Sequence, residues 1–253
     1  MLRCTPVLRL AAAGVLVLAG GPVGPAQPLE SSSLSAGAYR SDDWVPLDDA
    51  LRRWPARDYE LPVLAAQARR PRLADKRMVL TRFAQLVEAE AVSPLDLESI
   101  AVLEFLALEG VVARQAPYQP VPQTSPMIRR EAVELLGRIG GPHADTVMRT
   151  VMQRDRDLVV LAEAVYALGR IRTDADEELL RLLTEILAHN TRSLRDNNLA
   201  YATLLTVERL HRSSWGIDDP ALFRAVFEVR SGPFIGPVRR KADEVARLLR
   251  RGS

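Results

Sequence analysis

The sequence predicts an all-α protein built as a solenoid of stacked helical hairpins. Two observations lead to this prediction: one helical segment recurs along the chain, and every apolar pattern has the 3.6-residue period of a helix rather than the alternation of a strand. The composition agrees, since 47% of the 253 residues are apolar and only 5% are aromatic. We therefore expect more than half of the mature chain to be helical and no β-sheet to form.

The clearest repeat relates residues 128–139 to residues 160–171. Seven of the twelve paired positions are identical at an offset of 32 residues. Looser copies begin at Leu199 and Val238, and every copy places apolar or small side chains at positions i, i+4, i+7 and i+11. Such positions share one face of a helix, so each copy predicts an amphipathic helix.

A second set of helices is expected between these copies. Its members span residues 143–153, 174–189 and 220–228. Gly140-Gly141-Pro142 suits a left-handed helix end followed by a proline in the next first turn, and Asp219-Pro220 pairs a capping Asp with a proline at the first helical position. The chain therefore predicts a series of helix pairs.

Three further helix ends are predicted from capping chemistry. Residues 173–176 and 93–96 both have the spacing of a capping box, and the second also carries a proline where a helix would begin. Asn190 is expected to end its helix in the left-handed conformation.

These residues resemble HEAT-like repeats, especially the short form known from phycobilisome (bilin) lyases. The first copy matches at Ile128-Arg129, Ala132, Leu136-Gly137, Ile139-Gly140, Asp155 and Asp157, the second at Ala164, Leu168-Gly169 and Ile171, and the Val-Arg pair returns at Val238-Arg239. The resemblance is strong over residues 126–172 and weak over 173–253, where Ala200, like Leu161 before it, replaces the repeat arginine. It implies a right-handed α-α superhelix in which the motif residues serve packing.

The chain divides into five segments by composition. Residues 1–26 are typical of a signal peptide, with Arg3 and Arg9, an apolar run and small residues before a cleavage point after Ala26. The segments that follow are a flexible linker at 27–41, degenerate or capping hairpins at 42–113, a proline-rich loop at 114–125 and the HEAT-like repeats at 126–253. An uncleaved N-terminal membrane anchor is the alternative to cleavage.

The balance of charge argues against a nucleic-acid partner. Without residues 1–26 the chain has 32 basic and 32 acidic side chains, whereas proteins that hold phosphate backbones carry a basic excess. Residues 69–82 are rich in bases and residues 83–113 in acids, which predicts either complementary solvated helix edges or a docking patch. The basic C-terminal helix complements its own dipole and leaves peripheral contact with the cell envelope open.

No catalytic or metal-binding motif stands out. His143, His189 and His211 lack metal-ligand spacing, the single cysteine, Cys4, lies in the leader, and there is no glycine-rich phosphate loop. Ser213-Ser214 lies beside His211, but sequence adjacency is weak evidence for a nucleophile and base. We expect no cofactor and no enzymatic activity.

The sequence thus favours an exported, non-catalytic scaffold in the periplasm or envelope that binds another protein. Repeat positions that share one offset would form columns along such a stack, and they give the candidate partner-binding residues: Glu134, Arg138, Tyr166, Arg170 and Arg209. A lyase or ligand-handling protein related to the bilin lyases is the alternative function.

Overall fold

The computed structural model describes residues 57–111, 125–172, 174–214 and 216–251. All of them lie in one compact unit, Leu51–Ser253. The predicted signal peptide at 1–26, the linker at 27–41 and nearly all of the proline-rich loop fall outside the described residues. Among the helices that are described, none is both long and apolar enough to cross a membrane.

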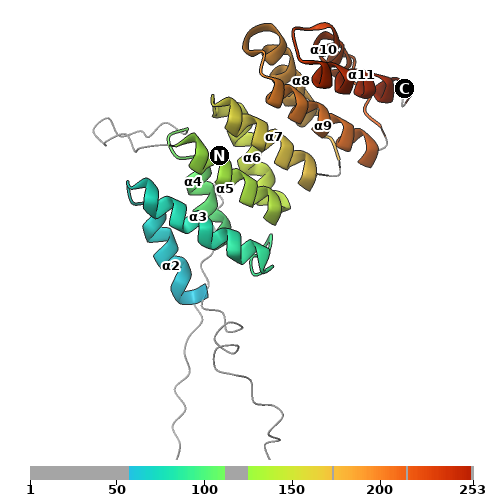
Figure 1. Cartoon of the computed structure of the whole chain (residues 1–253). Coiled ribbons are helices and arrows are strands. Elements are labelled where there is room, and N and C mark those ends of the chain that lie inside the picture. Colours follow the sequence, from blue (N-terminus) through green and yellow to red (C-terminus); the bar gives the residue numbers. More distant parts are fainter. Residues whose placement is uncertain (1–56, 112–124, 173, 215, 252–253) are drawn as a thin grey trace, which may run out of the picture. The chain divides into compact units, whose positions relative to one another are not determined.

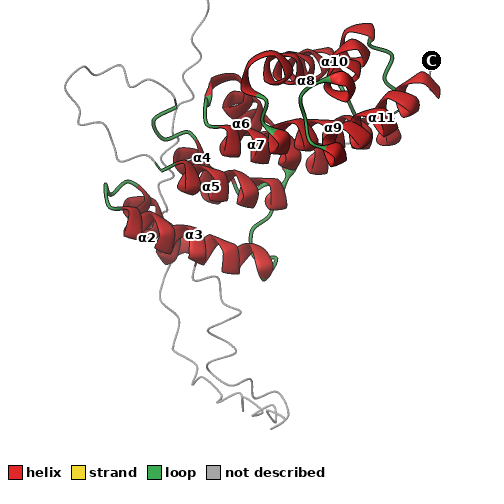
Figure 2. Ribbon diagram, turned by 45° about the horizontal axis from the view of Figure 1, so that its top comes forward, coloured by secondary structure: helices red, strands yellow, loops and turns green. Residues whose placement is uncertain are grey.

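Ten α-helices follow one another along the described chain, and no strand occurs in that part (Figure 1). They are α2 (Arg57–Ala68), α3 (Leu73–Glu88), α4 (Leu97–Ala107), α5 (Pro126–Ile139), α6 (Gly141–Arg154), α7 (Leu158–Ile171), α8 (Glu177–His189), α9 (Asn197–Ser213), α10 (Pro220–Ser231) and α11 (Gly236–Arg251). The odd-numbered helices α3 to α11 pack against one another as one layer, and the even-numbered helices α2 to α10 form the other (Figure 2). The prediction of an all-α stack of hairpins is confirmed.

Glycine allows the odd-numbered helices to approach closely. A Cβ atom placed on Gly137 in α5 would lie 2.6 Å from the Cβ of Ala167 in α7, and one on Gly169 in α7 would lie 2.5 Å from Oγ1 of Thr206 in α9. Both distances are too short for real side chains. We call the buried contact surface between α5, α7 and α9 the seam; Leu136 and Leu168, beside the two glycines, are both fully buried.

A buried ion pair accounts for the arginine and aspartates of the first repeat. Arg129 in α5 donates two hydrogen bonds to Asp155, at 2.7 and 3.1 Å, and both residues are buried. Asp155 also accepts from the backbone N–H of Asp157, whose own side chain caps α7 at Val159 and Val160. The motif residues therefore fix how the chain turns from α6 into α7.

The equivalent turn of the next repeat, from α8 into α9, is built differently, because Leu161 replaces the repeat arginine. Asn190 is fully buried, its amide donating to the carbonyl of Asp196 at 2.8 Å and accepting from the N–H of Asp196 at 2.9 Å. The prediction that Asn190 ends its helix in the left-handed region is wrong: its φ is −59°, the chain continues as a π-helical turn over Asn190–Leu194, and Arg195 takes the left-handed conformation.

Two helix starts also differ from the capping-box predictions. Helix α4 begins at Leu97 and α8 at Glu177, with Asp96 and Asp176 as the capping side chains; each accepts a hydrogen bond from the backbone N–H three residues on. At each start an aspartate accepts one of the free N–H groups of the first turn, so Ser93 is not the cap of α4, while Thr173 lies outside the described residues. The Asp219 cap and the left-handed Gly140 agree with the sequence.

The charge blocks at 69–82 and 83–113 are partly buried rather than fully solvated. Lys76 in α3 is fully buried and forms an ion pair with Glu109, which is also buried. Arg82, from the same basic block, pairs with Glu60 in α2 instead of with the acidic block. The blocks therefore hold the first helices together, and Lys76 is a core residue that its charge gave no reason to expect.

Candidate functional site

The structure places all five candidate partner-binding residues on the odd-numbered helices. Glu134 and Arg138 belong to α5, Tyr166 and Arg170 to α7, and Arg209 to α9. Two of the five are in contact: the Arg209 guanidinium lies 4.7 Å from the centre of the Tyr166 ring, and its Nη2 lies 3.4 Å from the Tyr166 hydroxyl. The other three lie along neighbouring helices, where Arg138 and Arg170 are exposed.

Beside this contact the layer is hollowed into an open groove of about 520 Å³. We call it the tyrosine groove. Its lining comes from α7, from α9 and from the start of α11, and it includes Leu158, Val159, Ala162, Glu163, Tyr166, Tyr201, Ala202, Leu205, Ile235 and Pro237. On α7 and α9 these residues recur at the same spacing, so that one face of each helix forms one wall.

Large apolar side chains are exposed in this groove. Val159 is 51% exposed, Tyr201 40% and Ile235 54%. Isolated exposed apolar residues are ordinary on protein surfaces, but several gathered in a concave site mark a place where another molecule binds. The groove thus has the form of a binding site lined mainly by carbon.

An ion pair closes the α5 side of the groove. Arg130 reaches from α5 to Glu163 in α7 at 3.3 Å, and its guanidinium also lies 3.5 Å from Glu134. Burial raises the pKa of the Glu163 carboxyl above its ordinary value, and the nearby charge of Glu134 adds to that rise, whereas Arg130 and, to a smaller extent, Arg170 oppose it. Arg130 is therefore committed to carboxylates of this chain.

The sequence prediction included Tyr166 but missed Val159, Tyr201 and Ile235. A signal was present in α7, which carries only two charged residues, Glu163 and Arg170, among its 14. The solvent-facing side of a helix packed in one layer is expected to be polar. An apolar residue such as Val159 therefore indicates that the position is either buried or part of a site. Periodicity alone does not separate these two outcomes.

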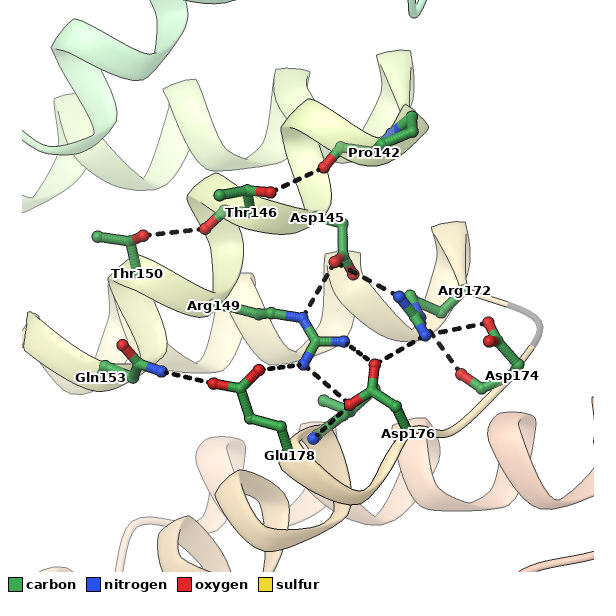
Figure 3. A network of polar contacts seen from close by, with 11 residues as sticks. Pro142, Asp145, Thr146, Arg149, Thr150, Gln153, Arg172, Asp174, Asp176 and Glu178 are labelled. Carbon is green, nitrogen blue, oxygen red and sulfur yellow. Dashed lines mark hydrogen bonds and ion pairs between the residues drawn. The ribbon is translucent and has the colours of Figure 1, made fainter. Parts of the chain in front are cut away.

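A polar network between α6 and α8 was the other candidate for a site. Arg149 donates to Asp145 at 3.0 Å and to Asp176 at 2.5 and 3.1 Å, and Arg172 donates to Asp176 at 3.0 Å (Figure 3). The hydrogen bonds from Arg149 hold the pKa of Asp176 below its ordinary value. Arginines of the chain bind both oxygens of Asp176 and one oxygen of Asp145, whose other oxygen is buried, so the network holds α6 against α8 and has little capacity for an external ligand.

His211 and the two serines that follow it make structural contacts. Nδ1 of His211 accepts a hydrogen bond from the N–H of Ile217 at 3.0 Å, and the hydroxyls of Ser213 and Ser214 donate to the carbonyls of Arg209 and Leu210. Neither Ser213 nor Ser214 is hydrogen-bonded to His211 as nucleophile and base would require. Across the described part of the chain, no group of three or more His, Cys, Asp or Glu residues could hold a metal ion.

Comparison with known families identifies the repeat. Residues 121–202, about a third of the chain, match the family model of HEAT repeats. Comparison with curated proteins and with solved structures found no match. The matched segment covers α5 to α8 and reaches into α9, so it extends beyond residues 126–172, where the resemblance is strongest. Together with the two layers of stacked helices, this match shows that the chain is a HEAT-like repeat protein.

Proposed function

We propose that this protein is an exported, non-catalytic scaffold whose tyrosine groove binds a segment of another protein. The observation that supports the proposal best is the exposure of Val159, Tyr201 and Ile235 in one concave site. HEAT repeats commonly serve protein interactions, and apolar or aromatic side chains in a concave surface are the usual anchors of such contacts.

The energetics favour a protein segment as the occupant. Covering the exposed parts of these side chains removes apolar surface from water at roughly 25 cal/mol per Å². Tyrosine adds contact area while little conformational freedom is lost, because its ring has two rotatable bonds. The groove is open along its length, so a chain can lie across α7 and α9 without being enclosed.

Export rests on the leader. The basic residues, the apolar run and the small residues before position 26 support cleavage and release into the periplasm, and an uncleaved anchor is the alternative. Mass determination of the N-terminus of the protein purified from the envelope fraction distinguishes them: a chain that begins near Gln27 supports cleavage, and a chain that begins at Met1 contradicts it.

Ligand handling is the second candidate function. Glu163, whose pKa is raised by burial, lies in the groove with Tyr166, and a carboxyl of this kind can serve as an acid or hydrogen-bond donor toward a small molecule. A coloured or otherwise detectable small molecule that copurifies in stoichiometric amount and is lost from Glu163→Gln would support this function over the scaffold.

Site-directed photo-cross-linking tests the scaffold directly. A photoreactive amino acid replaces Tyr201 in the groove or, as a matched control, the exposed Glu185 on α8 in the other layer. In cells that express the full chain we expect a discrete protein adduct from position 201 and none from position 185. The adduct should disappear when Ala162→Trp fills the groove. Equal labelling at both positions, or an adduct that survives Ala162→Trp, would contradict the proposal.

A further inference from the structure

Three arginines share one repeat position on α5, α7 and α9, beyond the end of the tyrosine groove; one of them, Arg170, is close enough to Glu163 to lower the pKa of that carboxyl. Arg138, Arg170 and Arg209 each follow a residue of the preceding turn, namely Glu134, Tyr166 and Leu205, by four positions. They therefore lie one helical turn further along the same face of α5, α7 and α9. We call this row the arginine edge. Within the described residues none of the three arginines forms an ion pair.

The acids nearest the groove, by contrast, already have partners in the chain. Glu163 and Glu134 face Arg130, Asp196 caps the N-terminus of α9, and Glu208 binds Lys241 at 2.5 Å. None of these acids is bonded to Arg138, Arg170 or Arg209, so the arginine edge forms a positive strip at the end of the apolar hollow.

Arg209 connects the arginine edge to the tyrosine groove. Its guanidinium stacks on Tyr166, which lines the groove, and its Nη1 is buried without a hydrogen-bond acceptor among the described residues. Burial has already removed part of the water around the Arg209 guanidinium. A carboxylate that pairs with it would therefore gain more than a carboxylate that pairs with a fully solvated arginine. Stacking on the tyrosine also holds the charged group at the groove wall.

From these observations we propose that the groove takes an acidic amphipathic peptide segment, with apolar side chains over Val159, Ala162 and Tyr201 and with carboxylates toward the arginine edge. This inference rests on the proposed function and adds the chemistry of the partner. Charge complementarity selects the partner: a neutral segment would cover the apolar surface and leave the arginines unpaired, and a basic segment would be repelled.

The test uses fluorescent synthetic peptides that share one pattern of leucine and phenylalanine and differ only at the polar positions, which carry Glu, Gln or Lys. Their dissociation constants for the full mature chain are measured by anisotropy at low and at high salt. We expect the Glu peptide to bind about tenfold more tightly than the Gln peptide, with the Lys peptide weakest, and the preference to shrink at high salt.

Two sets of substitutions show which feature is responsible. Arg138→Gln, Arg170→Gln and Arg209→Gln together should abolish the preference for the Glu peptide and leave the affinity for the Gln peptide within about twofold. A matched triple change of exposed arginines in the other layer and its connection, Arg181→Gln, Arg192→Gln and Arg224→Gln, removes the same charge and should leave the preference intact. Thermal unfolding of each variant verifies that it is folded.

The outcomes separate this inference from the proposed function. If the Glu and Gln peptides bind equally and Ala162→Trp abolishes both, the groove stands and the acidic partner is wrong. If Ala162→Trp leaves the Glu peptide bound as in the wild type, the groove itself is wrong. No binding of any peptide would overturn the inference, as would a single-stranded oligonucleotide that binds as tightly as the Glu peptide, because it carries charge without the apolar side chains.

Discussion

Helices α7 and α9 present two faces that differ in what they contact. Toward the seam they carry small and aliphatic residues without exposed surface: Gly169 in α7 lies against Thr206 in α9, and Leu168 is fully buried. Toward the tyrosine groove the same two helices carry Val159 and Tyr201, which remain largely exposed. The apolar side chains of the seam face are buried within the chain, whereas those of the groove face are not.

This difference teaches which residues hold the fold and which are left for a partner. The seam residues recur at the repeat offset because each copy packs against an equivalent helix, and this packing determines which residue types fit there. The groove residues do not recur as identities, since Tyr201 stands where α7 has Ala162. Stability and recognition should therefore respond to different substitutions on the same helix.

Leu168→Ala should have the largest effect on stability. The side chain is fully buried between helices, and its removal leaves a cavity that the rigid glycine-packed seam cannot close. We expect the free energy of unfolding to fall by about 2–5 kcal/mol in urea denaturation. Tyr201→Ser on the groove face is the control, with an expected loss within about 1 kcal/mol. A larger loss of unfolding free energy for Tyr201→Ser than for Leu168→Ala would contradict the comparison of the two faces.

Gly169→Ala should destabilise the protein although alanine favours helix. The added Cβ would lie 2.5–2.9 Å from three side-chain atoms of Thr206, whose hydroxyl donates to the carbonyl of Val165 at 2.8 Å. Overpacking of this kind costs about 1–3 kcal/mol, and the gain in helix propensity, about 1 kcal/mol, offsets only part of it.

A double-mutant cycle with Thr206→Ala isolates that contact. Because Thr206→Ala removes two of the three crowded atoms, the double variant should lose less stability than the sum of the two single variants. Strict additivity in chemical denaturation would mean that Gly169 does not meet Thr206.

His211 should make the stability of the protein sensitive to mild acid. Burial lowers the pKa of His211, and its Nδ1 accepts the N–H of Ile217, which requires an unprotonated Nδ1. The folded state then binds fewer protons than the unfolded state below pH 6.5, so stability is complete above that pH and falls as the pH drops toward the folded-state pKa. We expect the free energy of unfolding to fall as the pH is lowered from about 7.5 to about 5.5.

Thermal unfolding as a function of pH checks this expectation. His211→Gln should flatten the dependence over that range, whereas His189→Gln, a change at an exposed histidine, should leave the wild-type slope. A slope that persists in His211→Gln would assign the proton uptake to another group.

Arg170→Ala should have the smallest effect on stability. The side chain is exposed at the arginine edge and forms no ion pair within the described residues, so its loss should change the free energy of unfolding by only about 0.5 kcal/mol. If chemical unfolding showed a larger loss for Arg170→Ala than for Leu168→Ala, the assignment of the two faces would be reversed.

The sequence predicted the seam well because its signal is repetition. The shared glycine and leucine positions indicated close helix packing, and Gly137 and Gly169 show that contact against Ala167 and Thr206. The groove could not be predicted in the same way, because an exposed valine such as Val159 and a buried valine give the same periodic pattern. That Ile235 also lines the groove depends on where the chain before α11 lies, which the pattern does not indicate.

Local chemistry explains the other differences. The burial of Lys76 depends on Glu109, a residue 33 positions further along the chain that the fold brings against α3. Asn190 mimics the lost arginine–aspartate link by bonding to both backbone groups of Asp196, and this holds it in the helical conformation. The partner of Lys76 is 33 residues away, and that of Asn190, although only six residues away, is bound through its backbone, which a side-chain pattern does not indicate.

The most direct test of the division into seam and groove is the titration of Ala162→Trp with the Glu peptide. The indole should fill the hollow between α7 and α9 without entering the seam, because Ala162 lines the groove. We predict at least about a tenfold loss of affinity while the free energy of unfolding stays within about 1 kcal/mol of the wild type. Wild-type affinity in this folded variant would contradict the account.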